Sequence, residues 1–363
     1  MSKLSTLWCT IRDFLYPELE EALEPLTAKQ RQFIVVCELA RLDRQMGRYQ
    51  GCWLGRKKKP RVDFAKAFVA KAVYNLPTTD VLLEHLKGSK SLRRLCGWEH
   101  AADVPSPATF SRAFAEFADG GLGDTVHAAM IETHYGDKLA GHLSRDSTAI
   151  KAREKAAPKP KKEQQPKRRR GRPRKDEQRE PAPPKRLEMQ PRRSLQENVA
   201  ELPRACSWGS KTNSQGKKES WKGYKLHLDC VDGDIPVSAI LTSASLHDSQ
   251  VAIPLAQMSA QRVTNCYDLM DAAYDAETIA AFSRGLGHVP IIDSNPRSGG
   301  VEPLDPATAR RYHERSAAER VNAMLKDNHG GRFVRVRGDA KVRLHLLFGV
   351  IAICGLQLLR LLE

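Results

Sequence analysis

The chain has 363 residues, a length that suits two or three domains, and 41% of them are hydrophobic, which supports an ordinary globular core. Its 59 Lys and Arg against 43 Asp and Glu give a net charge of +16. That balance favours a polyanionic partner, because basic side chains displace counterions from phosphates; a basic protein without such a partner is the alternative.

The first 135 residues show helical patterns only. Thr27 to Gln30 has the form of a capping box, and an apolar run follows from Phe33 to Leu42. Apolar residues recur at helical spacing over 63–75, and 79–86 predicts a third helix. We therefore expect residues 1–135 to form an all-helical N-terminal domain, and two of its segments bear on a DNA-binding role.

Two shorter segments, 91–96 and 107–118, could form a helix-turn-helix. Ser106 suits the N-cap position and Pro107 the first position of the second helix. The residues facing a DNA groove would then be Thr109, Ser111 and Arg112. The connection is longer than a usual turn, so a helical bundle that packs on the rest of the protein stays an equal alternative.

Residues 151–204 stand apart in composition. The stretch 151–200 carries 18 Lys and Arg against 7 Asp and Glu, eight of the 21 prolines and no aromatic residue. Such a segment buries too little apolar surface to order itself, so we expect a disordered basic insertion. Its core, Arg170-Gly171-Arg172-Pro173, has the form of an AT-hook for the minor groove of A·T tracts. The alternative is a polycation that holds any DNA.

Residues 136–150 and 205–363 alternate between strand and helix patterns. Expected strands are 142–146, 224–231, 235–241, 263–270 and 288–292, and expected helices are 248–259, 276–284 and 306–326. This order predicts a mixed five-stranded α/β sheet flanked by helices, which is the order of the RNase H-like fold.

The apolar run from Leu346 to Leu356 is too short for a membrane span, so we expect a buried helix and no membrane partner. The eight cysteines form no Cys-x-x-Cys pair, and the N-terminus lacks the apolar core of a signal peptide. These features favour a reducing, cytoplasmic setting rather than a zinc or disulfide framework.

Two acids follow predicted strands. Asp146 closes the first strand and Asp271 the fourth, and active groups gather at the carboxyl ends of strands in open α/β sheets. Asp268 lies inside a strand pattern and Asp275 in a turn, so both are set aside.

A third acid lies in the predicted helix 306–326. On a continuous helix, one arc of about 60° would hold Tyr312, Arg315, Glu319 and Lys326. A carboxylate there can bind metal, and the cations and the phenol can hold phosphate oxygens. The alternative is a solvated helix with an Arg315–Glu319 pair.

These motifs resemble the bacterial insertion-sequence transposases of the DDE, RNase H-like class. Tyr312-x2-Arg315-x3-Glu319-x6-Lys326 matches the signature of the YREK subgroup, Asp271-Ala-Ala-Tyr274-Asp275 resembles the context of the family's second acid, and Asp146-Ser-Thr that of the first. The resemblance covers nearly the whole chain. Asp271 and Glu319 are 48 positions apart, which leaves no room there for the large insertion domain of some relatives.

The resemblance implies that Asp146, Asp271 and Glu319 hold two Mg²⁺ ions, with Mn²⁺ as a substitute, for DNA cleavage and 3′-end transfer. Tyr312, Arg315 and Lys326 would grip terminal phosphates. The partners would be terminal inverted repeats and target DNA, bound by a homodimer near the bacterial nucleoid. Two alternatives remain open: an inactive or repurposed DNA-binding protein, and a nuclease or resolvase on the same fold.

One further expectation concerns the tryptophans. A tryptophan could stack on an extruded base, but we expect Trp208 and Trp221 to be buried in the core or an adjoining loop.

Overall fold

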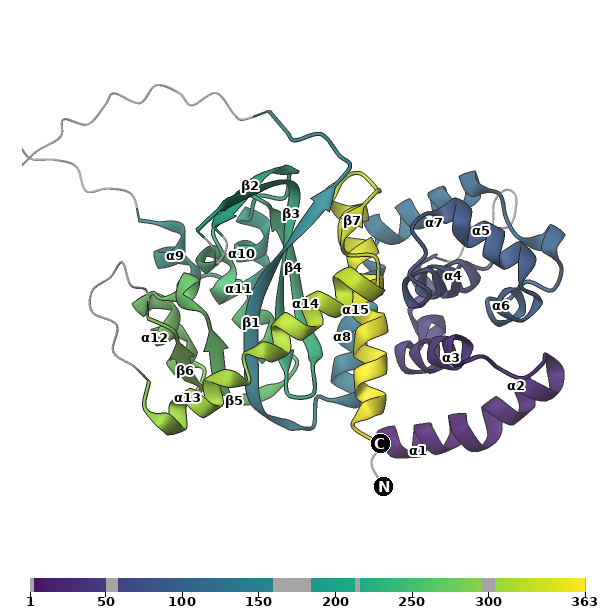
Figure 1. The fold of residues 1–363 in the computed structure, drawn as a ribbon, viewed down its shortest axis with the longest axis horizontal. Helices are drawn as coiled ribbons and strands as arrows, with labels where there is room; N and C mark the ends of the chain where they lie inside the picture. Colours follow the sequence, from purple (N-terminus) through teal and green to yellow (C-terminus); the bar gives the residue numbers. More distant parts are fainter. Residues whose placement is uncertain (1–2, 50–57, 159–183, 213–215, 295–303, 363) are drawn as a thin grey trace, which may run out of the picture.

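The computed structural model describes residues 3–49, 58–158, 184–212, 216–294 and 304–362. A helical N-terminal part lies on one side of a sheet-containing part, and the long helix α15 (Asp339–Arg360) lies between them (Figure 1). Both the predicted fold class and the all-helical N-terminal region are confirmed.

The N-terminal part contains eight α-helices among the residues described. They are α1 (Lys3–Thr10), α2 (Tyr16–Ala22), α3 (Ala28–Ala40), α4 (Arg61–Val73), α5 (Thr79–Gly88), α6 (Lys90–Leu95), α7 (Pro107–Asp119) and α8 (Leu122–His134). A π-helical segment, η1 (Ile11–Leu15), continues α1 directly into α2, and the short 3-10 helices are η2 (Leu42–Gln45), η3 (Gly47–Tyr49) and η4 (Ala101–Asp103). The capping box at Thr27 and Gln30 is confirmed, with both reciprocal hydrogen bonds present.

The described residues contain one seven-stranded sheet. Its strands are β1 (Leu139–Ala152), β2 (Ser207–Thr212), β3 (Lys218–Val231), β4 (Ile235–Ser243), β5 (Thr264–Met270), β6 (Val289–Ile292) and β7 (Phe333–Val334). Strands β4, β3 and β1 are antiparallel neighbours, and β5 and β6 continue parallel to β1. The five expected strands are all present, and this order is that of the RNase H-like fold.

Two strands were not expected from the sequence. Strand β2 pairs with the first half of β3, and β7 adds two residues parallel to the end of β1. Where β3 passes from β2 to β1, Gly223 has φ +154, and a Cβ there would lie 2.0 Å from the Ile150 carbonyl oxygen. Glycine is therefore required at this crossing.

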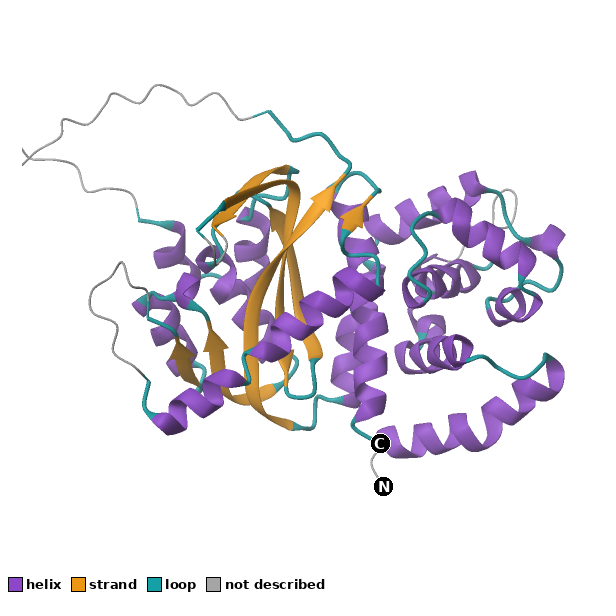
Figure 2. Ribbon diagram, viewed as in Figure 1, coloured by secondary structure: helices purple, strands orange, loops and turns teal. Residues whose placement is uncertain are grey.

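Helices cover both faces of the sheet (Figure 2). One hydrophobic cluster joins the sheet to α14 (Ser316–Asn328) and α15, and α14 crosses the strands diagonally. On the other face lie α11 (Ser249–Ala260) and α12 (Glu277–Gly285), which share two further clusters with the strands and turns. The remaining elements are η6 (Ala272–Tyr274) and α13 (Pro306–His313).

Part of the segment 151–204, which was expected to be disordered, is ordered in the structure. Residues 159–183, which include the Arg170–Pro173 motif, lie outside the described residues. Residues 184–204, in contrast, carry α9 (Arg186–Met189), η5 (Gln190–Arg192) and α10 (Leu195–Glu201). Amides fix this segment on α11: Gln190 Nε2 donates to the Gln250 carbonyl at 2.7 Å, and Asn198 Nδ2 to Gln257 Oε1 at 2.9 Å. Composition alone predicted disorder wrongly here.

Helix α15 belongs to two cores at once. It is apolar and long enough to span a membrane by length and composition, but 78% of its most apolar window is buried inside the protein. Phe348 stacks on Phe68 of α4, while Val350 and Ile353 pack with the sheet. The prediction of a buried helix over 346–356 is confirmed.

Candidate active site

Asp146 lies near the middle of β1, with strands on both sides. It pairs with Leu228 of the antiparallel strand β3, and β5 runs parallel on the other side. The predicted strand end at Asp146 is wrong: β1 continues to Ala152 because β3 and then β7 supply backbone partners. A strand's length depends on such partners, which no local pattern around Ser147 and Thr148 reveals.

Asp271 follows β5 directly, as predicted. The parallel register pairs Arg145 with Met270, so the next residues, Asp146 and Asp271, occupy neighbouring positions on the opposite face. Asp271 Oδ1 accepts a hydrogen bond from the Ala273 amide at 3.0 Å and so caps η6. The fold therefore brings together two acids that are 125 positions apart in the sequence.

Both aspartates bind protons more tightly than an exposed carboxylate. Burial, together with the charge of Asp271, raises the pKa of Asp146 to about 6, although the Ser147 amide, Arg315 and Asn322 oppose the shift. Burial also raises the pKa of Asp271, to which Asp248 adds. Two half-buried carboxylates side by side lack full neutralisation, which is the electrostatic condition that a bound cation relieves.

The helix expected over 306–326 is two helices. Helix α13 ends at His313 and α14 begins at Ser316, with tight backbone hydrogen bonds in the turn, such as Arg315 N to the Tyr312 carbonyl at 3.0 Å. Tyr312 therefore lies on a different helix from Glu319. No Gly or Pro marks this break, so the helical-wheel argument wrongly assumed one continuous helix.

Arg315 links the residues of this turn. Its guanidinium lies 5.6 Å from the centre of the Tyr312 ring and donates to Glu319 Oε1. Burial lowers the pKa of Arg315, but the charges of Tyr312, Glu319, Asp146 and Asp271 outweigh it, so the pKa is raised overall. Arg315 thus interacts electrostatically with all three predicted acids.

Asn322, one turn beyond Glu319, is a site residue that the sequence analysis missed. Its Nδ2 donates to Asp146 Oδ2 at 2.9 Å, and its own Oδ1 is buried without a hydrogen bond among the described residues. The spacing in the sequence could have identified Asn322, because a residue three positions after Glu319 faces the same side of the helix. Lys326 lies one turn further on; burial lowers its pKa, as does Lys211, while Asp146 opposes the shift.

Asp248 is a second missed residue, on the other face of the sheet. Lys225 Nζ lies 2.9 Å from its Oδ1, and the pKa of Asp248 is lowered because His227 and Lys225 together outweigh burial. Its charge also acts on Asp271 and on the buried Tyr274, whose hydroxyl has no hydrogen-bond partner in the described chain. His247, in contrast, is exposed and bonds Ser249, in keeping with a capping role.

A metal site built from all three predicted acids requires one change from this arrangement. Among the described residues, no three His, Cys, Asp or Glu side chains converge closely enough to hold a metal ion. Asp146 and Asp271 offer adjacent hard oxygen donors that fit a divalent cation, whereas Glu319 is engaged by Arg315 and its side chain is 53% exposed. A three-carboxylate site would need Glu319 to leave Arg315.

Comparisons with known families agree with this geometry. Residues 138–354 match the model of a transposase DDE domain, and residues 19–116 match a second transposase domain. The chain belongs to the DDE transposases. A search of curated proteins found no match. Transposases of this family act on DNA as cutting and transferring enzymes and generally use divalent metal ions.

The residues of α7 that were predicted to face a DNA groove differ in their exposure to solvent. On α7, Ser111 and Arg112 are exposed and Thr109 is half-buried, while Phe110 and Phe117 are buried in the core. Ser106 occupies the N-cap position but bonds the Thr109 hydroxyl instead of a backbone amide.

The two tryptophans differ from expectation. Trp221 is buried, as expected, but Trp208 is 61% exposed on the edge strand β2, so its expected burial is wrong.

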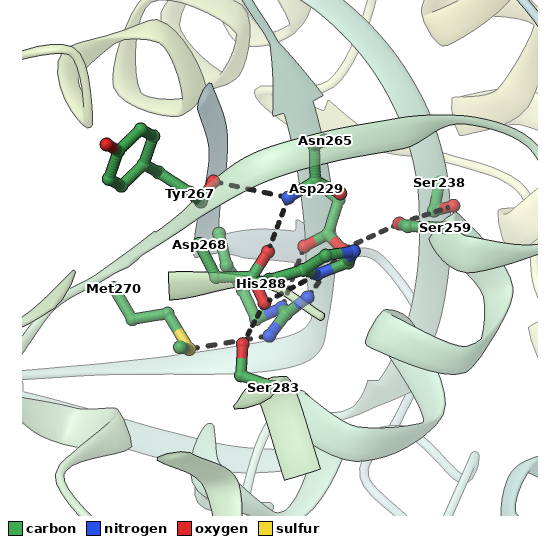
Figure 3. A network of polar contacts seen from close by, with 10 residues as sticks. Asp229, Ser238, Ser259, Asn265, Tyr267, Asp268, Met270, Ser283 and His288 are labelled. Atoms are coloured by element: carbon green, nitrogen blue, oxygen red, sulfur yellow. Dashed lines mark hydrogen bonds and ion pairs between the residues drawn. The ribbon is translucent and has the colours of Figure 1, made fainter. Parts of the chain in front are cut away.

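Behind the two aspartates, a buried polar network joins the strands of the transposase (Figure 3). Arg145 donates twice to Asp229, at 2.8 and 2.7 Å, and Ser259 donates to the same carboxylate at 2.7 Å. Asp268 accepts from Asn265 at 2.9 Å and also contacts Ser283 and His288. The network fixes Arg145, which directly precedes Asp146, and Asp268, which lies three positions before Asp271.

Proposed function

We propose that the chain binds the ends of a transposon, cleaves DNA there and joins the released 3′ ends to target DNA. In cleavage, a water oxygen bonds to phosphorus, the P–O3′ bond breaks, and a 3′-hydroxyl and a 5′-phosphate result. In transfer, that 3′-oxygen attacks a target phosphorus and displaces a target 3′-hydroxyl. The observation that carries the proposal is the β1–β5 register, which makes Asp146 and Asp271 neighbours beside α14.

The proposed roles follow from position. Asp146, Asp271 and, once released by Arg315, Glu319 would hold Mg²⁺, for which Mn²⁺ could substitute. When bound, the metal ions would supply Lewis acidity at the attacking and leaving oxygens. Arg315, Tyr312 and Lys326 would bind phosphate oxygens, and a phosphate that draws Arg315 away would free Glu319. Residues 1–135 would serve DNA binding, with 136–150 and 205–363 as the catalytic part.

The first test replaces single acids. Asp146→Asn, Asp271→Asn and Glu319→Gln should each bind DNA like wild type but lose cleavage by more than about a thousandfold, beyond the effect of one lost transition-state hydrogen bond. Glu277→Gln, an exposed acid on α12, is the matched control and should cleave normally. Strong cleavage by Glu319→Gln with Mg²⁺ present would refute the assignment.

Other functions predict different products. A DNA-binding protein without catalysis would bind transposon ends and cut nothing with either metal. A nuclease or resolvase would cut but would not join a labelled transposon end to a target plasmid. Joined products that require matched inverted repeats support the transposase reaction, and mixing differently tagged chains tests whether a dimer assembles on two ends.

The basic segment around Arg170, Gly171, Arg172 and Pro173 has its own test. We propose that it binds the minor groove and nearby phosphates, as its sequence indicates. Deletion of 163–178 should lower DNA affinity and flatten its dependence on salt, by about 0.9 in log–log slope for each phosphate that the chain no longer neutralises. Unchanged binding across salt concentrations would show that the segment has no such role.

A further inference from the structure

A cavity of about 400 Å³ lies between the helical N-terminal part and the segment that joins β7 to α15. Helices α4, α5 and α7 line one side, and residues 335–345 line the other. A water molecule occupies about 30 Å³ in the liquid, so the cavity has room for a hydrated oxyanion. It is separate from Asp146 and Asp271, neither of which lines it.

The most informative residue of this cavity is Lys71. It lies on α4 with only 9% of its surface exposed, and no hydrogen bond or ion pair of its ammonium is found in the described parts of the chain. Burial, together with the charge of Arg335, lowers its pKa to about 8. Buried charges are normally paired, so an unpaired lysine facing a cavity indicates a missing anion.

Three more cations line the same cavity without a carboxylate partner among the described residues: Arg335, Arg337 and Lys341. Their sequence neighbours behave differently. Arg332 pairs with Asp327, and Arg343 pairs with Asp124. Within one short segment, the cations that turn away from the cavity are neutralised, and those that line it are not.

Helix ends and hydroxyl groups add to this positive character. The cavity is lined by Thr79 at the start of α5, and by Pro107 and Ser111 in the first turns of α7. Free amides and the helix dipole make the start of α5 favourable for anions, whereas Pro107 has no N–H and Ser111 of α7 offers its hydroxyl. One carboxylate, Asp80, also lines the cavity and offsets one of the four cations. His345 adds no charge, since burial, with the charge of Lys71, lowers its pKa to about 3.

We propose that this cavity binds a backbone phosphate of the DNA on which the enzyme acts, with Lys71, Arg335, Arg337 and Lys341 as its donors. The inference rests on the proposed function for the identity of the DNA. Such a contact would position the duplex without reading its sequence. It would also tie the helical part and the catalytic part to one DNA molecule.

The length of β1 gives an estimate of the distance between this phosphate site and the site acids. Strand β7 pairs with Lys151 and Ala152 at the end of β1, six positions beyond Asp146. At about 3.3 Å per residue, the end of β1, beside which the cavity-lining segment begins, lies roughly 20 Å from Asp146. That span corresponds to roughly six nucleotides along one strand, at about 3.4 Å each.

The test compares Lys71→Met and an Arg335→Gln/Arg337→Gln double variant with wild type, as full chains, on a duplex carrying the transposon end. Arg284→Gln is the control, because this exposed arginine pairs with Glu277 on α12. The log–log salt slope of binding should fall by about 0.9 for each phosphate that is no longer neutralised, and should not change in the control. Lys71→Met should melt no lower than wild type, because it removes an unpaired buried charge.

A neutral methylphosphonate, moved along the duplex one position at a time, identifies the phosphate. Wild type should lose affinity at a position roughly six nucleotides from the cleavage point, and Lys71→Met should show no further loss there. Equal affinity and slope in all proteins would overturn the proposal. A second result would also overturn it: inorganic phosphate raises the melting temperature of wild type but not of the variants, while DNA binding is the same in all of them. That result would assign the cavity to a free anion.

The outcomes also separate this inference from the proposed function. Normal cleavage and unchanged salt slopes in the cavity variants would overturn the phosphate site and leave the proposed reaction intact. If wild type never cleaves DNA but the cavity variants bind it more weakly than wild type does, the phosphate site stands and the proposed reaction is overturned. A wild-type chain that binds no DNA would overturn both.

Discussion

Two groups of carboxylates lie on opposite faces of the same strands and have opposite chemistry. Arg145 and Asp146 are consecutive in β1, so their side chains point to opposite faces. On Arg145's face, Asp229 and Asp268 are buried and fully hydrogen-bonded. On the other face, the only side-chain hydrogen bond that Asp146 receives from the described residues comes from Asn322, and its pKa is raised.

The comparison teaches that pairing, rather than acidity or burial, distinguishes a structural acid from a reactive one. Burial alone would raise the pKa of Asp268, but His288, Arg145 and Ser283 outweigh burial and lower it. For Asp146, Arg315 and Asn322 oppose burial without outweighing it. The pKa of Asp229 is raised by burial as well, so its two hydrogen bonds from Arg145, rather than its pKa, mark it as structural. The paired group holds the strands in register, and the incompletely paired group remains available to a cation.

The largest expected effect follows from breaking the paired group. Arg145→Met leaves the fully buried Asp229 without its cation and should cost about 3–5 kcal/mol in the free energy of unfolding. Urea denaturation followed by circular dichroism measures this loss. The double variant Arg145→Met/Asp229→Leu should recover much of it, and the control Arg320→Met, which breaks an exposed pair with Asp234, should cost less than about 1 kcal/mol. A loss in Arg145→Met no larger than in this control would contradict the structural role.

A smaller effect is expected from the one amide that supports Asp146. Asn322→Ala removes the hydrogen bond to Asp146 Oδ2, and should lower cleavage by about 10- to 100-fold while leaving DNA affinity unchanged. Asn328→Ala, at the exposed end of the same helix, is the control. The metal concentration needed for half-maximal cleavage should rise in Asn322→Ala only. If both variants cleave alike, Asn322 does not position the acid.

The last prediction concerns pH. The folded chain holds the Asp146 proton more tightly than the unfolded chain, with a pKa of about 6 against 3.8. Asp146 therefore costs no stability well below pH 3.8, and its cost grows as pH rises towards 6, where the carboxylate ionises. Without metal, the melting temperature of wild type relative to Asp146→Asn should fall over this range, and added Mg²⁺ should reduce the difference. Parallel melting curves at all pH values would contradict the raised pKa.

Much of the fold could be predicted from the sequence because its elements carry local signals. Apolar alternation marked β3 to β6, and Thr27 and Pro107 marked helix starts. Strands β2 and β7 gave no such signal, since they are short and depend on distant partners. Helix α10 did carry one, the capping box of Ser194 and Glu197, but the composition of its surroundings concealed it.

The site was predictable to a similar degree. Asp271 was correctly placed after its strand, and the contact of Arg315 with Glu319 follows from their spacing. The neighbouring positions of Asp146 and Asp271, however, depend on a register between strands that are remote in sequence. The inclusion of Asn322 depends on how α14 lies across the sheet, and sequence periodicity does not specify that packing.

Helix α15 has a consequence for how the chain is made. It follows all of its packing partners in the chain, yet it completes the cores of both the helical part and the sheet. During synthesis, the apolar surfaces around Phe68 and Leu325 remain exposed to solvent until α15 emerges from the ribosome. At Gly349 the helix approaches so closely that a Cβ would lie 2.6 Å from Leu325 Cδ1. A copy truncated before this helix would expose both cores, so folding itself discriminates against incomplete copies.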